Sequence, residues 1–143
     1  MKNRLISGIF FIILGLLIGL GPIILFPVCR VHTTIMKCFW TARTELGIGI
    51  LTGIFGIFLI IFPSVQLRIG LSISLVLNGI LGLLVPDILI GVCDGKHMSC
   101  RLLTLPALNI LNMAVIIAAA VNGLSLYQTD KRNKEMKKRQ VEP

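Results

Sequence analysis

The sequence predicts an all-α fold, an integral membrane bundle of four transmembrane helices made of two similar helical hairpins. Hydrophobic residues make up 55% of the 143-residue chain, charged residues only 14%, and the mean hydropathy is +0.93. A soluble domain of this size cannot bury so much apolar surface. The charged residues are confined to segments between long apolar runs, and the second half of the chain repeats the first in outline. These three observations predict the fold class.

Four apolar runs predict the helices, whose approximate bounds are 5–26, 42–62, 67–92 and 102–127. Each run approaches the ~20 residues that a helix needs to cross a hydrocarbon core of about 30 Å. The first run could instead be a cleaved signal peptide that begins with Lys2 and Arg4. It is longer than the usual apolar region of a signal peptide, and Pro22 directly follows its best small-residue site. We therefore expect it to be a transmembrane helix.

The basic residues predict the orientation, because cytoplasmic segments near a membrane carry an excess of lysine and arginine. Nine of the 14 lie on the side of the N-terminus, namely Lys2, Arg4, Arg68 and six in "KRNKEMKKRQ" (131–140). The other five are Arg30, Lys37, Arg43, Lys96 and Arg101. We expect both termini inside, residues 131–143 as a basic cytoplasmic tail, and all four cysteines outside, where disulfides persist.

Half of the formal charge of +8 comes from that tail, which holds six basic and two acidic residues. A basic segment beside a membrane attracts anionic lipid. The sequence therefore predicts the lipid bilayer as a partner, and it does not indicate nucleic-acid binding.

An offset of 64 positions aligns the two halves of the chain. Arg4 then matches Arg68, Pro22 matches Pro86, and "PIILFPVC" (22–29) lies over "PDILIGVC" (86–93). After a two-residue gap, "MKC" (36–38) lies over "MSC" (98–100). We expect a duplicated helical hairpin in which both copies start inside, so that their loops lie side by side on the outer face.

Small and amide residues predict how the helices pack. "GLLIG" (15–19) and "GILTG" (49–53) are small-xxx-small patterns that let helix backbones approach closely. Asn78, Asn109 and Asn112 lie within apolar runs. In lipid such amides are expected to hydrogen-bond across helices.

The cysteines Cys29, Cys38, Cys93 and Cys100 admit three roles. As structural disulfides in the two outer loops they allow three pairings. Alternatively, the layout resembles the bacterial disulfide-bond membrane oxidases and their vitamin K epoxide reductase relatives, which pass electrons to a quinone. Those catalysts typically carry Cys-x-x-Cys, and this chain has none. Lys37 and Arg101 nevertheless flank Cys38 and Cys100 and would favour thiolates.

The third role is soft-metal binding. Cysteine and methionine sulfur suit Cu(I). The candidate ligands are Cys38, Met36, Cys100, Met98, His32 and His97. Outside the membrane, however, cysteines tend to oxidise, which works against this role.

"MKCFWTARTELGIG" (36–49), with the later "VC…MSCRLLTLPAL", is similar to an uncharacterised family of small bacterial four-helix membrane proteins, a domain of unknown function. The similarity covers most of residues 5–125. It centres on Cys29, Met36, Cys38, Trp40, Thr41, Ala42, Glu45, Cys93, Cys100, Arg101 and Pro106. It implies the four-helix fold and a multi-pass location in a bacterial plasma membrane, and it supplies no catalytic residues. The similarity also implies an association with export-type transporter permeases, and therefore an accessory role.

A polar cluster of Arg43, Glu45 and Arg101 is a further candidate site. With the second helix beginning near residue 42, Glu45 would lie in its first turn, where the helix dipole favours an acid. Arg43 does not face Glu45 at this spacing, so we expect Arg101 to be the partner. An acidic residue at membrane depth is also a functional candidate.

Together these features predict a small integral membrane accessory protein with two disulfide-bearing outer loops, which partners a transporter or another extracytoplasmic protein or forms a homo-oligomer. The sequence shows no Ser/His/Asp arrangement and no phosphate-binding glycine loop, which favours a non-enzymatic protein without a cofactor. The alternatives are a quinone-linked thiol–disulfide oxidoreductase and a Cu(I)-binding membrane protein.

Overall fold

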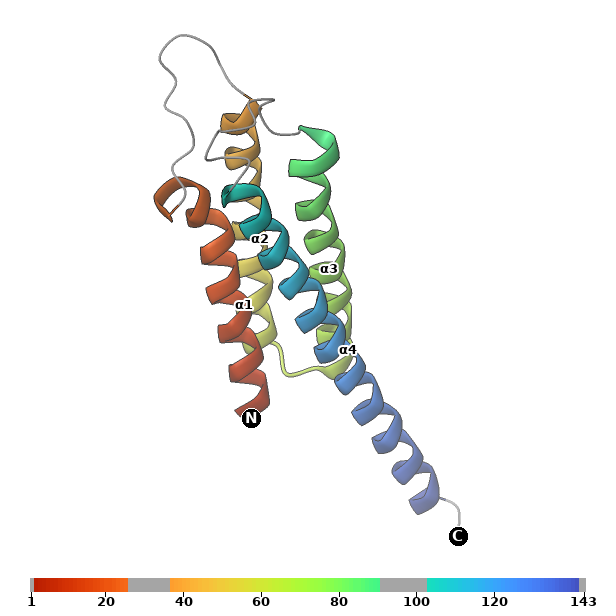
Figure 1. Cartoon of the computed structure of the whole chain (residues 1–143). Helices are drawn as coiled ribbons and strands as arrows, with labels where there is room; N and C mark the ends of the chain where they lie inside the picture. The colour runs from red at the N-terminus through yellow and green to blue at the C-terminus, as the bar shows by residue number, and fades with distance from the viewer. Residues whose placement is uncertain (1, 26–36, 91–102, 142–143) are drawn as a thin grey trace.

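The computed structural model describes residues 2–25, 37–90 and 103–141 (Figure 1). These residues form helices and no strand. In chain order the elements are α1 (Lys2–Leu20), the π-helical turn η1 (Gly21–Leu25), α2 (Lys37–Ile61), α3 (Val65–Leu84), the π-helical turn η2 (Val85–Leu89) and α4 (Leu105–Val141). The predicted all-α fold is confirmed.

Three helices are long and apolar enough to cross a membrane. Their spans are Phe39–Ile61, Val65–Leu89 and Leu105–Arg139. The apolar part of α1, Arg4–Leu20, is shorter, although η1 follows it directly. The chain is therefore a membrane protein by the length and composition of its helices.

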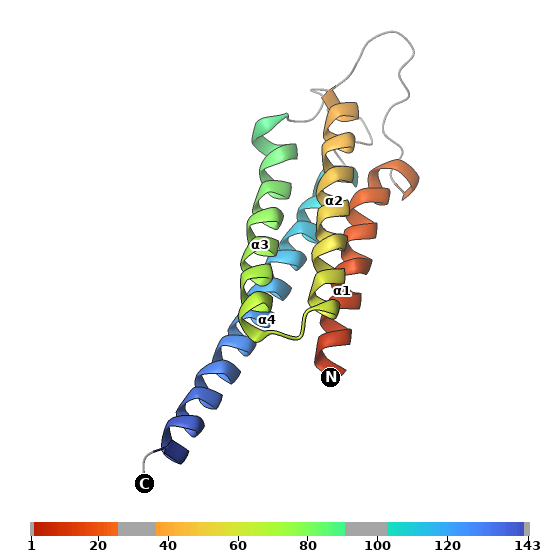
Figure 2. The ribbon, with the colours of Figure 1, turned by 180° about the vertical axis from the view of Figure 1, so that it is seen from behind.

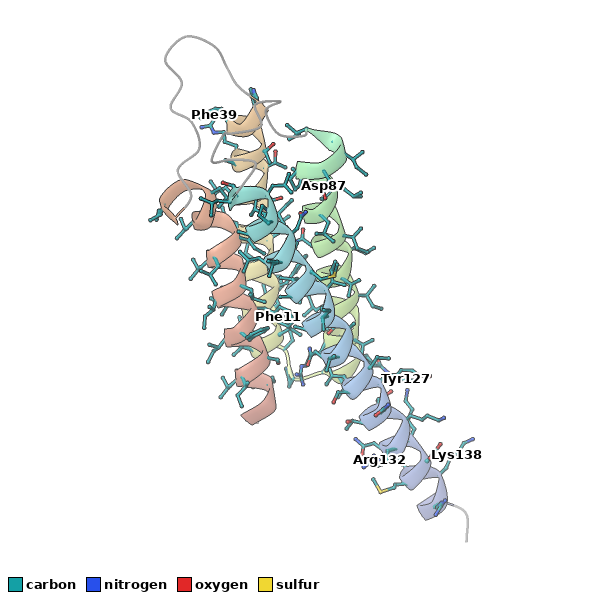
Figure 3. The ribbon with its side chains drawn as sticks, viewed as in Figure 1. Phe11, Phe39, Asp87, Tyr127, Arg132 and Lys138 are labelled. Atoms are coloured by element: carbon teal, nitrogen blue, oxygen red, sulfur yellow. The ribbon has the colours of Figure 1, made fainter. Side chains whose placement is uncertain are left out.

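Two helix bounds differ most from the sequence expectation. α2 begins at Lys37 rather than near residue 42. α4 is 37 residues long and continues through most of the basic tail, which gives it a length of about 55 Å. Its last turns therefore project beyond the bundle, where Tyr127, Arg132 and Lys138 lie (Figure 3).

Proline accounts for the two π-helical turns. Pro22 is the second residue of η1, and Pro86 is the second residue of η2. Proline lacks the N–H that an α-helix would use, so the backbone widens locally. In η2 the widened bond runs from the Ile90 N–H to the Val85 carbonyl, at 3.0 Å.

The core lies where the helices meet. α1 packs along α2, and α3 packs along α4. The side chains of Phe11, Ile18, Leu59, Leu75 and Val115 are at most 1% exposed and fill the centre. α1 begins at the same end of the bundle as the connection between α2 and α3, and α4 extends beyond that end (Figures 1 and 2).

Two glycine patterns form the contact between α1 and α2. A Cβ on Gly15 would lie 2.6 Å from the carbonyl oxygen of Gly49, and one on Gly49 would lie 2.5 Å from the backbone nitrogen of Gly19. No side chain fits there, so the backbones touch directly. The close approach predicted from the small-xxx-small patterns is confirmed, and the two patterns pack against each other.

The outside of the bundle is apolar. Large hydrophobic side chains are exposed on every helix, among them Ile6, Ile54, Ile73, Ile88 and Ile110. In water such a surface would be an aggregation hazard. It therefore indicates contact with the lipid bilayer.

Candidate functional site: a buried acid and amide within the bundle

Glu45 lies inside the bundle. Its side chain is 0% exposed, and both carboxylate oxygens are covered. Because α2 begins at Lys37, no acid lies in its first turn, and Glu45 lies about 12 Å along the helix axis from its start. The expectation that Glu45 sits in the first turn as a helix cap is therefore wrong.

Arg43, the other described member of the predicted polar cluster, does not pair with Glu45. Arg43 is exposed, and its guanidinium lies 5.3 Å from the centroid of the Phe39 ring. The expectation that Arg43 and Glu45 do not face each other is confirmed. Arg101 lies outside the described residues, so its predicted pairing with Glu45 stays a prediction.

Asn112 of α4 lies beside the Glu45 carboxylate. It is also 0% exposed. Neither of its amide atoms meets the distance and angle of a hydrogen bond, and the same holds for the two carboxylate oxygens. An acid and an amide from two different helices therefore adjoin in the interior, separated from the surrounding solvent and lipid.

Gly82 of α3 makes room for the Asn112 amide. A Cβ at Gly82 would lie 2.6 Å from Asn112 Cγ and 2.7 Å from Nδ2. α3 thus contributes to the site by the absence of a side chain. Any larger residue at Gly82 would force the Asn112 amide to shift.

The chemistry of the pair favours a neutral acid. A buried carboxylate without a positive partner is very costly. A protonated carboxyl can donate to the Asn112 oxygen, while its own carbonyl oxygen accepts from the Asn112 nitrogen. A small relaxation of the two side chains would satisfy both groups, so a protonated Glu45 fits this environment.

A second amide ties α3 to α2 nearby. Asn78 donates from Nδ2 to the carbonyl oxygen of Ile48, at 3.2 Å, and to Thr52 Oγ1, at 2.9 Å. The predicted hydrogen bond across helices is confirmed for Asn78. Asn109 also bonds to another element, donating to Asp87 Oδ2 at 3.3 Å. Asn112 does not follow this expectation, since its amide adjoins Glu45 without an aligned hydrogen bond.

The cysteine loops lie almost entirely outside the described residues. This holds for Cys29, Cys93, Cys100, Met36, Met98, His32 and His97. Cys38 belongs to the first turn of α2, but its side chain is not described. Within the described ranges no group of three His, Cys, Asp or Glu residues could hold a metal ion. The disulfide, redox and Cu(I) roles stay predictions.

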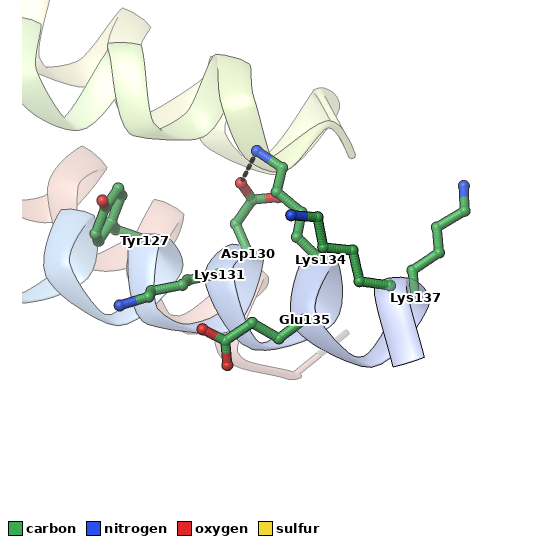
Figure 4. A pocket seen from close by; sticks show the side chains of 7 residues that line it. Tyr127, Asp130, Lys131, Lys134, Glu135 and Lys137 are labelled. Atoms are coloured by element: carbon green, nitrogen blue, oxygen red, sulfur yellow. Dashed lines mark ion pairs between the residues drawn. The ribbon is translucent and has the colours of Figure 1, made fainter. Parts of the chain in front are cut away.

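A hollow lies beside the projecting end of α4 (Figure 4). Its lining includes Tyr127, Asp130, Lys134 and Glu135. Lys134 Nζ and Asp130 Oδ2 form an ion pair of 2.7 Å one helical turn apart. Exposed pairs of this kind add little stability. The hollow lies outside the apolar bundle and is lined by Tyr127 and by charged side chains with their alkyl stems.

The sequence missed how the buried pair is assembled. Glu45 was a candidate in a cluster with Arg43 and Arg101, and Asn112 was expected only to join helices. Nothing in a sequence relates two residues so far apart until the crossing of α2 and α4 is known. The one available signal was that both are polar residues within apolar runs.

One comparison with known proteins finds a match. The family model described as "Domain of unknown function (DUF4418)" matches residues 11–125. The chain belongs to this family. The matched region contains Glu45, Gly82 and Asn112, and the similarity to a domain of unknown function that the sequence indicated is confirmed. No curated protein and no solved structure matches the chain.

Proposed function

We propose that the chain is a small accessory subunit of a bacterial plasma membrane. Four helices cross the bilayer with both termini inside, and two disulfide-bearing outer loops contact a transporter permease or another extracytoplasmic protein. The observation that carries this proposal is a bundle whose centre is filled by buried side chains and whose outside is apolar. Such a body suits helix-to-helix contact within lipid better than solute passage.

The continuity of α1 and η1 supports four crossings. Together they run from Lys2 to Leu25. That length suffices for the hydrocarbon core. The nine basic residues counted above belong to the end where α1 begins and α4 finishes, which supports the placement of both termini inside.

The ends of the elements support a duplicated hairpin. α1 ends at Leu20 and α3 at Leu84, and a π-helical turn follows each, at Gly21 and at Val85. Both pairs of positions are 64 apart, which is the offset of the sequence repeat. Pro22 and Pro86 are the physical cause that the two copies share.

The helix contacts support the same duplication. A Cβ on Gly15 would lie 2.7 Å from the backbone nitrogen of Gly53. A Cβ on its counterpart Gly79 would lie 2.7 Å from Ile116 Cγ1. Gly53 and Ile116 are 63 positions apart, so both hairpins cross at nearly equivalent places.

The outer face of α1 is the surface we assign to the partner. An apolar hollow there is lined by Ile13, Leu16, Leu17, Leu20 and Ile24. A hollow on one helix face accepts the side chains of a neighbouring transmembrane helix. Contact at this face would leave the outer loops free to meet the extracytoplasmic part of the same partner.

Photocrosslinking in native membranes tests the accessory role. A photoreactive residue at Ile13 should give one defined protein adduct. The matched control is Ile73, an exposed isoleucine of α3, which should give only lipid adducts. Identical adduct patterns from the two positions, or lipid adducts alone from both, would contradict the proposal.

A redox titration separates this role from the two alternatives. Mass mapping of the four cysteines against a glutathione couple should find disulfides that stay closed below about −300 mV. Pairs that open between about −120 and −230 mV would favour thiol–disulfide exchange with a quinone. Four free thiols that bind Cu(I) would favour the metal-binding role.

A further inference from the structure

Two arginines lie at equivalent places at one end of the bundle. Arg4 is in the first turn of α1, and Arg68 is in the first turn of α3. Arg68 is only 9% exposed, and the Nε atoms of both side chains are covered without a hydrogen-bond partner. α1 and α3 begin at the same end of the bundle, which brings the two like charges close enough to repel each other.

No described acid neutralises this pair. The ion pair formed in the described ranges joins Lys134 to Asp130, on the projecting end of α4. Glu45 is buried beside Asn112, and Asp87 accepts a hydrogen bond from Asn109. Both of these acids lie toward the opposite end of their helices from the arginines.

The neighbouring hydroxyls do not satisfy the guanidinium groups either. Ser7 Oγ donates to the carbonyl oxygen of Arg4, at 3.2 Å, and Ser72 Oγ donates to that of Arg68, at 2.9 Å. Asn122 Nδ2 in turn donates to Ser72 Oγ, at 3.2 Å. These bonds involve the backbone carbonyls of the two arginines and none of their guanidinium nitrogens.

The backbone adds positive potential at the same place. α1 and α3 both begin at this end of the bundle (Figure 1). The N-terminus of a helix carries a partial positive charge and free N–H groups. Two arginines and two helix N-termini thus converge without an anion, an arrangement that costs free energy unless an anion binds.

We propose that Arg4 and Arg68 form a binding site for a phosphate group at the membrane interface. The planar guanidinium fork matches the oxygens of a phosphate and binds them by charge-assisted hydrogen bonds. The phosphate is either the headgroup of an anionic phospholipid or free phosphate. The site requires that the bundle spans a bilayer, but not the accessory role, so it stands if that role fails.

Native mass spectrometry of the full chain in detergent tests the site. The probes are phosphatidylglycerol, phosphatidylcholine and inorganic phosphate, each titrated separately and then in competition. The test variants are Arg4→Gln and Arg68→Gln. The controls are Arg43→Gln, an exposed arginine of α2, and Arg132→Gln, an exposed arginine of the projecting helix.

We expect each test variant to lower the retained phosphatidylglycerol about tenfold, the effect of losing one charge-assisted hydrogen bond. Both control variants should retain as much as the unmodified chain. Retention of phosphatidylglycerol that inorganic phosphate does not displace identifies a lipid headgroup. Equal binding of inorganic phosphate identifies the free ion, and either result supports the site.

A conservative variant separates binding from folding. Arg68→Lys keeps the charge and loses the fork, so its retention should fall between those of the unmodified chain and Arg68→Gln. If Arg68→Gln does not fold, Arg4→Gln and Arg68→Lys carry the test. Folded test variants that retain as much ligand as Arg43→Gln would overturn the proposal.

Discussion

At the residue scale, the adjoining Glu45 and Asn112 are the feature that most needs an explanation. Both are fully buried, and their polar atoms are not yet paired. Burying two polar groups without hydrogen bonds costs free energy, so their presence in a packed interior requires a compensating interaction. Held neutral by one proton, the acid and the amide can satisfy each other. This accounts for an ionisable residue within a span of otherwise apolar surroundings.

Glu45→Gln tests that account. Glutamine is neutral and similar in shape, so we expect the free energy of unfolding in detergent to change by less than about 0.5 kcal/mol. Glu45→Ala leaves the Asn112 amide unpaired beside a cavity and should lower it by about 2–3 kcal/mol. Urea unfolding followed by tryptophan fluorescence measures both. Equal damage from the two substitutions would mean that the ionised carboxylate is required.

Asn78 of α3 makes the side-chain hydrogen bonds to α2. Asn78→Ala removes both of its hydrogen bonds and should lower the free energy of unfolding by about 0.6–1.7 kcal/mol. Asn109→Ala is the control, because its single bond to Asp87 is long and exposed. The same urea experiment compares the two variants. A larger loss from Asn109→Ala would contradict the assignment.

At the scale of elements, the beginning of α2 decides the role of Glu45. The sequence expectation near residue 42 placed this acid in the first turn, where it would face headgroups. The structure begins α2 at Lys37, which moves Glu45 into the interior. Polar residues such as Thr41 and Arg43 concealed the earlier turns of the helix, because hydropathy marks the membrane span rather than the helix itself.

The contact between α1 and α2 depends on glycine at specific positions. A Cβ on Gly49 would meet the backbone of Gly15 and Gly19, so Gly49→Ala must force the helices apart. We expect a loss of more than about 2 kcal/mol in the free energy of unfolding. Gly47 of the same helix is the matched control, since a Cβ there meets nothing within 4 Å. Gly47→Ala should be neutral or stabilise the helix by up to about 1 kcal/mol.

At the scale of the whole molecule, the positions of the chain ends relate the fold to the membrane. The start of α1, the connection between α2 and α3, and the end of α4 lie toward one end of the bundle (Figure 2). The basic residues of the termini belong to this end. The apolar sides of the bundle fit the hydrocarbon core, and the charged, projecting end of α4 fits water and lipid headgroups.

Reporter fusions test the resulting topology. A reporter that is active only in the cytoplasm should be active when fused after residue 141 and when inserted at the 62–64 connection. The same reporter inserted in residues 30–35 should be inactive, because the proposed topology puts that loop outside. Activity at residues 30–35 together with inactivity at the C-terminus would reverse the orientation.

The sequence by itself determined the helical class, the apolar spans and the glycine contacts. These depend on local composition and on spacings of a few residues, which helix geometry converts directly into one face. It also indicated the family and placed Glu45 among the candidates. The alignment of its two halves also matched Pro22 with Pro86, the prolines of the two π-helical turns.

Only the tertiary structure decided which polar groups meet. Glu45 and Asn112 come from helices far apart in the chain, and the space between them depends on Gly82 of a third helix. The sequence used Arg4 and Arg68 only to predict orientation, and the structure brings the helix starts that carry them to the same end of the bundle. Such encounters depend on how helices cross, and crossing depends on the packing of all four helices at once.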